Sequence, residues 1–182
     1  MSTSETAERL FERYAFPYWL RDHSRLVGAI AHALALARIA AGDAIDVDTV
    51  TLAAYLHDIG RSPLLAGDSR EHNELSALIL AAEGLSECAE PARRHAIYTV
   101  LDAATAPRSM AEKIVYIADR RGGTKIETIA ERAKDTAARH PKFAGDIVRA
   151  IPIAQGIERE VFARLAFAPD ALAAHVAIPA VQ

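Results

Sequence analysis

The residues of this sequence whose types and spacing could do chemistry are its histidines, of which there are seven. Four of them, His23, His57, His72 and His95, lie in separate segments with apolar residues three, four or seven positions away. Residues with that spacing share one face of a helix, so we expect these four to face the core. One buried histidine is usually a hydrogen-bonded core residue, but four together indicate a metal, which satisfies polar imidazole nitrogens.

The other three histidines are not expected to take part. His32 follows His23 by nine residues, about 900° of helical rotation, and therefore points the opposite way, towards solvent. His140 precedes Pro141 and is expected in a turn. His175 lies near the end of the chain with no carboxylate beside it.

Two carboxylates strengthen the metal hypothesis. Asp58 and Asp119 are both expected at the C-terminal ends of helices, where an anion is disfavoured by roughly 0.3–1 kcal/mol. A bound cation reverses that preference because it is the largest charge nearby. For Asp119, the alternative is a salt bridge with Arg120, Arg121 or Lys125.

The elements that must position these residues are helices. Apolar positions recur at intervals of three and four, strand-like alternation is nearly absent, and alanine, the best helix former, is the commonest residue. Ser109 with Glu112 and Thr124 with Glu127 each have the spacing of a capping box. The sequence therefore predicts an all-α bundle of about six to eight helices, over 4–14, 22–41, 46–58, 71–83, 86–100, 109–121, 124–139 and one or two between 141 and 165.

Length and composition are typical of one globular domain. The 182 residues are expected to form a single unit, with a core over about 14–140, C-terminal helices over 141–167 and an Ala/Pro-rich tail over 168–182. A net charge of −3 argues against binding to nucleic-acid polymers or membranes. One cysteine excludes an internal disulfide framework, and no signal peptide or membrane span is recognisable. We expect a cytoplasmic protein.

Several segments carry a family resemblance. The stretch 53–61, Ala-Ala-Tyr-Leu-His-Asp-Ile-Gly-Arg, resembles the signature of the HD-domain metal-dependent phosphohydrolase superfamily, in its single-domain HDIG form. Segments 23–27, 71–77, 84–95 and 112–119 resemble the other ligand-bearing stretches of that family, in the family's order. The Gly-Tyr-Pro extension of the cyclic-di-GMP branch is absent from the sequence, as are the domains that accompany (p)ppGpp hydrolases.

The resemblance implies one or two divalent ions, which could be Mn, Fe, Ni, Co, Zn or Mg. It implies six ligands, four imidazoles and two carboxylates, which are His23, His57, Asp58, His72, His95 and Asp119. Of these, Asp58 would bridge a first ion to a second one held by His72 and His95. Some family members keep only the first set and bind one ion.

The implied activity is hydrolysis of a phosphate ester of a small molecule, with a nucleotide as the favoured substrate, by attack of a metal-bound hydroxide. Asp58 would orient the hydroxide, and Arg61 would bind phosphate, since a guanidinium matches it bidentately. Glu71 would orient a ligand or carry a proton. Arg61 and Glu71 could equally be solvated surface charges. The expected partner is a small phosphorylated substrate, and a homodimer is left open.

Two alternatives come from other functional classes. Histidine-rich ligation of both ions also suits a di-iron HD-domain oxygenase that activates dioxygen. A non-catalytic helical module that binds a nucleotide or regulates a partner would be marked by lost ligands, and none of the six is lost.

Overall fold

The computed structural model describes residues 2–177, which are helical apart from loops and one isolated β-bridge between Gly122 and Ile126. The all-α prediction is confirmed. Among these residues, no helix is both long and apolar enough to cross a membrane. The α-helices are α1 (Thr3–Arg13), α2 (Tyr18–Ala40), α3 (Val47–Leu56), α4 (His72–Ala82), α5 (Ser86–Arg93), α6 (Met110–Arg121), α7 (Ile129–Arg139), α8 (Ala144–Phe162) and α9 (Leu172–His175).

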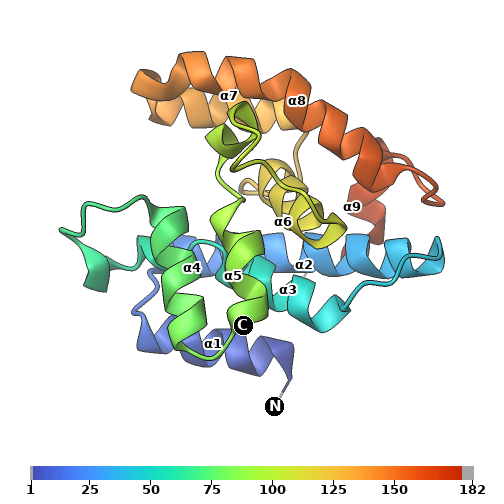
Figure 1. Ribbon diagram of the computed structural model, residues 1–182. Helices are drawn as coiled ribbons and strands as arrows, with labels where there is room; N and C mark the ends of the chain where they lie inside the picture. Colours follow the sequence, from blue (N-terminus) through green and yellow to red (C-terminus); the bar gives the residue numbers. More distant parts are fainter. Residues whose placement is uncertain (1, 178–182) are drawn as a thin grey trace.

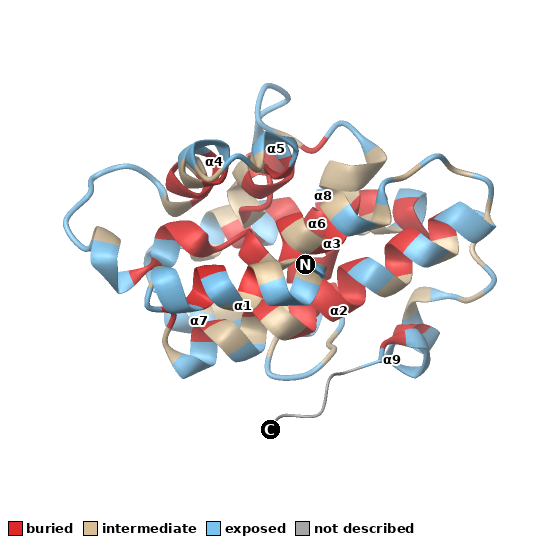
Figure 2. Cartoon of the chain, turned by 90° about the horizontal axis from the view of Figure 1, so that it is seen from below, coloured by how far each residue is buried: buried red, intermediate tan, exposed pale blue. Residues whose placement is uncertain are grey.

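Helix α2 is the centre of the bundle and packs against α3 and α6 (Figure 1). Helices α4 and α5 pack against each other, while α7 and α8 pair in a layer above α6. Buried positions concentrate on α2, α3 and α6 (Figure 2), where Leu34, Leu56 and Ile117 are fully enclosed. Three of the five elements that carry or precede candidate ligands are therefore anchored in the core, namely α2, α3 and α6.

The two expected capping boxes had different outcomes. Ser109 and Glu112 form one, and it opens α6 as predicted. The second prediction is wrong, because the box that opens α7 is formed by Thr128 and Glu131. Residues 124–127 instead belong to a tight connection in which the Glu127 amide bonds to the carbonyl of Arg121.

Two other helix boundaries also differ from expectation. Helix α2 begins at Tyr18, with Pro17 as its N-cap, so Asp22 lies inside the helix rather than capping it. The helix expected over 86–100 ends at Arg93 and is followed by a 3₁₀ segment, Ile97–Leu101. The Thr99 hydroxyl bonds to two backbone carbonyls of the connection, and such bonds compete with helix formation.

The C-terminal part also differs in detail. Helix α8 runs unbroken through Pro152, which lies on an exposed face. In the region expected to be a tail, Leu172 on α9 and Val176 are buried in the core. The part of that tail over 178–182 lies outside the described residues.

Candidate metal centre

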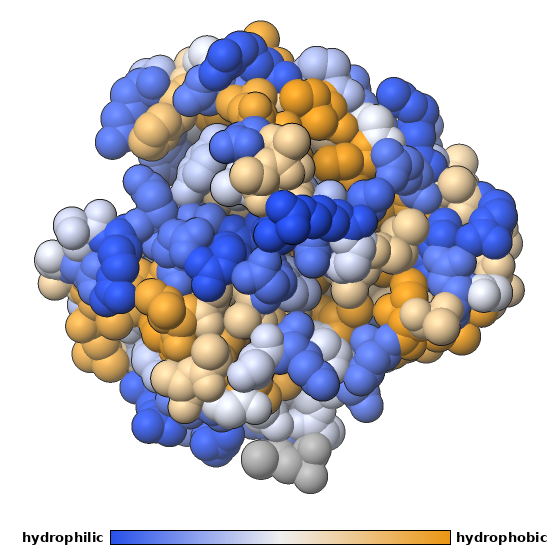
Figure 3. All heavy atoms as spheres, viewed as in Figure 1, coloured by the Kyte–Doolittle hydropathy of each residue, from blue (hydrophilic) through white to orange (hydrophobic). Residues whose placement is uncertain are grey.

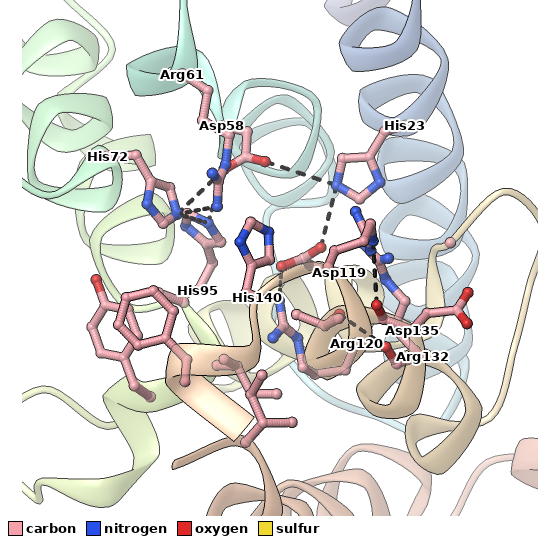
Figure 4. A pocket seen from close by; sticks show the side chains of 18 of the residues that line it. His23, Asp58, Arg61, His72, His95, Asp119, Arg120, Arg132, Asp135 and His140 are labelled. Atoms are coloured by element: carbon pink, nitrogen blue, oxygen red, sulfur yellow. Dashed lines mark hydrogen bonds and ion pairs between the residues drawn. The ribbon is translucent and has the colours of Figure 1, made fainter. Parts of the chain in front are cut away.

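Six side chains from five parts of the chain come together; five of them line one cavity (Figure 4), and His57 lies fully buried against them. Helix α2 supplies one of these side chains from near its start, α6 supplies one from its last turn, and α4 supplies that of its first residue. Two more lie directly after α3, and one lies two residues beyond α5. They are His23 (α2), His57 and Asp58 (after α3), His72 (α4), His95 (after α5) and Asp119 (α6).

One group of atoms surrounds the His23 imidazole. The Nε2 atoms of His23 and His57 are 3.2 Å apart. Asp119 Oδ1 is 3.2 Å from His23 Nε2 and 3.8 Å from His57 Nε2. Asp58 Oδ2 is 3.6 Å from His57 Nε2 and 4.0 Å from His23 Nε2. The atoms that would coordinate an ion therefore point at one another.

A second group surrounds the other oxygen of Asp58. Asp58 Oδ1 is 3.2 Å from His95 Nε2 and 3.5 Å from His72 Nε2, and these two nitrogens are 3.2 Å apart. Figure 4 shows His72 and His95 on one side of Asp58 and His23 on the other. Each carboxylate oxygen of Asp58 thus faces its own set of imidazoles, the arrangement that a bridging ligand requires. That these residues bind metal stays a prediction.

The orientation of two imidazoles fits metal binding. His57 Nδ1 lies 2.7 Å from the carbonyl oxygen of Ala54, and His95 Nδ1 lies 2.6 Å from that of Ala92. A carbonyl only accepts, so Nδ1 carries the proton and donates it, and Nε2 presents its lone pair to the cluster. Metal-binding histidines commonly have this second contact, which fixes the ring. The donor set suits a divalent transition metal.

The protonation states of the histidines also fit. Burial lowers the pKa of His57 from 6.5 to about 4, although the charges of Asp58 and Asp119 oppose the shift. Burial likewise lowers the pKa of His72 to about 3. Both rings are therefore neutral at physiological pH, which is the state that coordinates a metal.

The two carboxylates are held as anions. Burial alone would raise the pKa of Asp58, but the Arg61 charge and the nearby imidazoles outweigh it and lower the pKa well below 3.8. Burial opposes the same shift at Asp119, where Arg120 and His23 lower the pKa. Asp119 does pair with Arg120, as the alternative expected, but through Oδ2, while Oδ1 faces His23.

Gly60 allows the turn that contains His57 and Asp58 to pack closely against α4. The backbone N–H of Gly60 donates to Ser76 Oγ at 2.9 Å. A Cβ at this position would lie 2.0 Å from the carbonyl oxygen of His72, so only glycine permits such a close approach. This contact places the turn after α3 against the first residue of α4. Asp58 and His72 thereby come within reach of each other.

The three residues predicted to act on substrate line the cavity, and they are Asp58, Arg61 and Glu71. Arg61 contacts two candidate ligands, with Nε donating to Asp58 Oδ1 at 2.7 Å and Nη2 lying 2.9 Å from His72 Nε2. Glu71 is the N-cap of α4, and its Oε2 accepts a long 3.5 Å bond from the Tyr98 hydroxyl. Neither prediction of a role is tested by this geometry.

The cavity has a volume of about 910 Å³ and a second wall that the sequence did not reveal. This wall is formed by α7, the 3₁₀ turn Pro141–Phe143 and the start of α8, and it includes Arg132, His140 and Phe143. Figure 3 shows hydrophilic side chains in a band across this face, below the α7–α8 layer. His140 does follow a helix end, as expected, but its place in the cavity depends on how α7 packs.

The remaining histidines lie elsewhere. His32 is exposed, as predicted, and its Nδ1 lies 3.2 Å from Thr51 Oγ1. His175 is exposed on α9, and its ring stacks on Phe167 with centroids 3.9 Å apart. Neither lines the cavity.

Comparison with known proteins gives one match. A family model described as "HD domain" matches residues 20–123, more than half of the chain. No curated protein and no solved structure matched. The matched range contains all six candidate ligands, whereas α7 and α8, which form the second wall, follow it.

Proposed function

Because this chain belongs to the HD-domain family, we propose that it is a metal-dependent phosphohydrolase, which cleaves a phosphate ester of a small molecule. The observation that carries the proposal is the position of Asp58. Its two oxygens face two separate pairs of imidazoles, and a cavity large enough for a small organic molecule opens beside them.

The residues have distinct tasks in this proposal. His23, His57, Asp58 and Asp119 would hold one ion, and Asp58, His72 and His95 a second one. Bound there, divalent ions would supply Lewis-acid activation of water and of the phosphoryl group. Asp58 would contribute one carboxylate oxygen to each group of ligands and so fix the distance between the two groups. Arg61 lines the cavity with a side chain that is 40% exposed, and its guanidinium would bind phosphate oxygens once an ion replaces its contacts with Asp58 and His72.

Glu71 has a separate task in the proposal. It lies on the cavity wall directly before His72 and is exposed, so it can exchange protons with solvent. A carboxyl group there would take a proton from water and pass it on to the leaving group.

A nucleotide is the substrate class that we propose. The support comes from the aromatic side chains that line the same cavity, which are Trp19, Tyr98 and Phe143. Trp19 is 62% exposed at the start of α2, so its ring is open to contact with a ligand. Flat aromatic rings offer stacking surfaces to a nucleobase.

The experiment is a screen of phosphorylated metabolites against the purified protein, supplemented separately with Mn, Ni, Co, Zn or Mg. We expect metal-dependent release of phosphate that EDTA stops and that Asp58→Asn abolishes. His32→Ala serves as the matched control, because it removes a histidine outside the site and should keep full activity.

Two results would contradict the proposal. Two tightly bound irons with an oxygen-sensitive spectrum, and no release of phosphate, would favour an oxygenase. Nucleotide binding without turnover under every metal condition would favour a regulatory module.

A further inference from the structure

The second wall of the cavity holds a cation without a counter-ion. Arg132 lies on α7 and lines the cavity. Within residues 2–177, its guanidinium takes part in no hydrogen bond or ion pair, and its Nε is buried without a partner. Leaving a buried donor unsatisfied is costly, and the cost is greater for a charged group. Such a group calls for an anionic ligand.

The surroundings of Arg132 increase its need for an anion. Burial lowers its pKa, and the nearby positive charges of Arg120 and Arg139 add to the lowering, while the attraction of Asp119 and Glu127 offsets it only in part. Arg120 is engaged with Asp119, and Arg139 bonds to the backbone carbonyl of Asp135. Within residues 2–177, no carboxylate forms an ion pair with Arg132, although Asp135 lines the same cavity.

The cation that we assign to the scissile phosphate is a different one. Arg61 contacts Asp58 and His72, whereas Arg132 comes from α7, on the far side of Asp119 (Figure 4). Arg132 also lies outside the part of the chain that matches the HD-domain model. Two guanidinium groups on separate walls would serve two anionic groups of one ligand.

We propose that Arg132 forms a second phosphate subsite, so that the preferred substrate is an organic molecule that carries a second phosphate besides the one that is cleaved. The subsite rests on the proposed phosphohydrolase function for its catalytic meaning. A guanidinium binds phosphate bidentately, and apolar side chains such as Ile97 and Ile147 line the same cavity and suit the organic part of the ligand.

The kinetic test compares nucleotides that differ by one added phosphate, such as adenosine 5′-monophosphate and adenosine 3′,5′-bisphosphate. For the wild type, we expect a higher kcat/KM with the bisphosphate. Arg132→Gln should lower the ratio of the two kcat/KM values at least tenfold. The control is Arg9→Gln, which makes the same charge change at an exposed residue of α1 outside the cavity and should keep the ratio. Equal losses on both esters would overturn the proposal, because Arg132 would then bind the cleaved phosphate.

A binding test does not depend on catalysis. In metal-free protein, pyrophosphate should raise the Tm of the wild type and of Arg9→Gln. In Arg132→Gln, the rise should be at most half as large. An equal rise in Arg132→Gln, or no rise in the wild type, would overturn the subsite. If no ester is hydrolysed under any metal condition, the proposed function fails, and this binding result alone decides on the subsite.

Discussion

The Arg61 guanidinium donates from Nε to Oδ1 of Asp58 at 2.7 Å, and this oxygen is also the one that faces His72 and His95. Its Nη2 lies 2.9 Å from His72 Nε2. Arg61 therefore stands where the second group of ligands converges. Because the guanidinium contacts Asp58 Oδ1 and His72 Nε2, it would have to move before an ion could bind to these two atoms.

Arg61→Ala should raise the affinity for metal at the second group and weaken binding of the phosphate ester. Removing the guanidinium frees Asp58 Oδ1 and His72 Nε2, but it also removes a charge-assisted bond to substrate, so we expect KM to rise about tenfold or more. Metal titration by calorimetry and steady-state kinetics measure the two effects. Arg70→Ala, which removes a loop arginine paired with Asp68, is the control and should change neither. Unchanged KM and unchanged metal affinity in Arg61→Ala would contradict both assignments.

Asp58→Asn should reduce the metal content at both groups, since each oxygen of Asp58 belongs to a different group. His95→Gln should lower it mainly at the second group, because His95 Nε2 contacts Asp58 Oδ1 and His72. Elemental analysis after dialysis gives ions per chain. His32→Ala should match the wild type. Full metal content in Asp58→Asn would remove the basis of the proposed centre.

The metal-free protein should lose stability as the pH falls from about 6.5 towards about 4. The pKa of His57 is lowered from 6.5 to about 4 and that of His72 to about 3, so in this range the unfolded chain binds protons that the folded chain does not. Below that range, Asp58 and Asp119, whose pKa values are also lowered, add a loss of the same sign.

Urea unfolding in EDTA at a series of pH values measures this dependence. His72→Gln should show a shallower loss than the wild type between about pH 6.5 and about pH 4. His32→Ala should follow the wild-type curve. A stability that stays constant through this interval would show that the buried imidazoles accept protons without cost.

Gly60→Ala should destabilise the fold by about 1–3 kcal/mol, the range typical of overpacking. The added methyl group would meet backbone atoms of His72 and Ser76, which cannot move without shifting α4. Metal content at the second group should fall as well, since His72 moves with the helix. Gly145→Ala is the matched control, because its Cβ meets nothing within 4 Å and alanine favours the helix. Thermal unfolding compares the two, and equal Tm values would contradict the prediction.

The ligand-bearing parts of the chain were open to prediction because their signals are local. The apolar spacing around His23 and the carboxylate in the last turn of α6 are readable without tertiary structure. His95 was expected on a helix and lies instead in the connection after α5. In this connection the Thr99 hydroxyl donates a hydrogen bond to the backbone carbonyl of Arg94. The His95 ring is nevertheless directed into the site, since Nδ1 bonds to Ala92.

The second wall of the cavity could not be predicted from the sequence, and the reason is physical. Arg132 is one of several basic residues on an amphipathic helix, and its spacing does not distinguish it from an exposed one. Only the packing of α7 against α8 and α6 places it beside the cavity without an ion-pair partner among the described residues. The shifted capping box at Thr128 also hid the true start of this helix.

The cavity is assembled from two consecutive stretches of chain, with the candidate ligands within residues 20–123 and the facing wall contributed by α7 and α8. Under the two proposals, the first stretch would break the bond, and the second would add Arg132 to the contacts that select the compound. Substitutions confined to α7 would then change which compounds are accepted and leave the reactive centre in place.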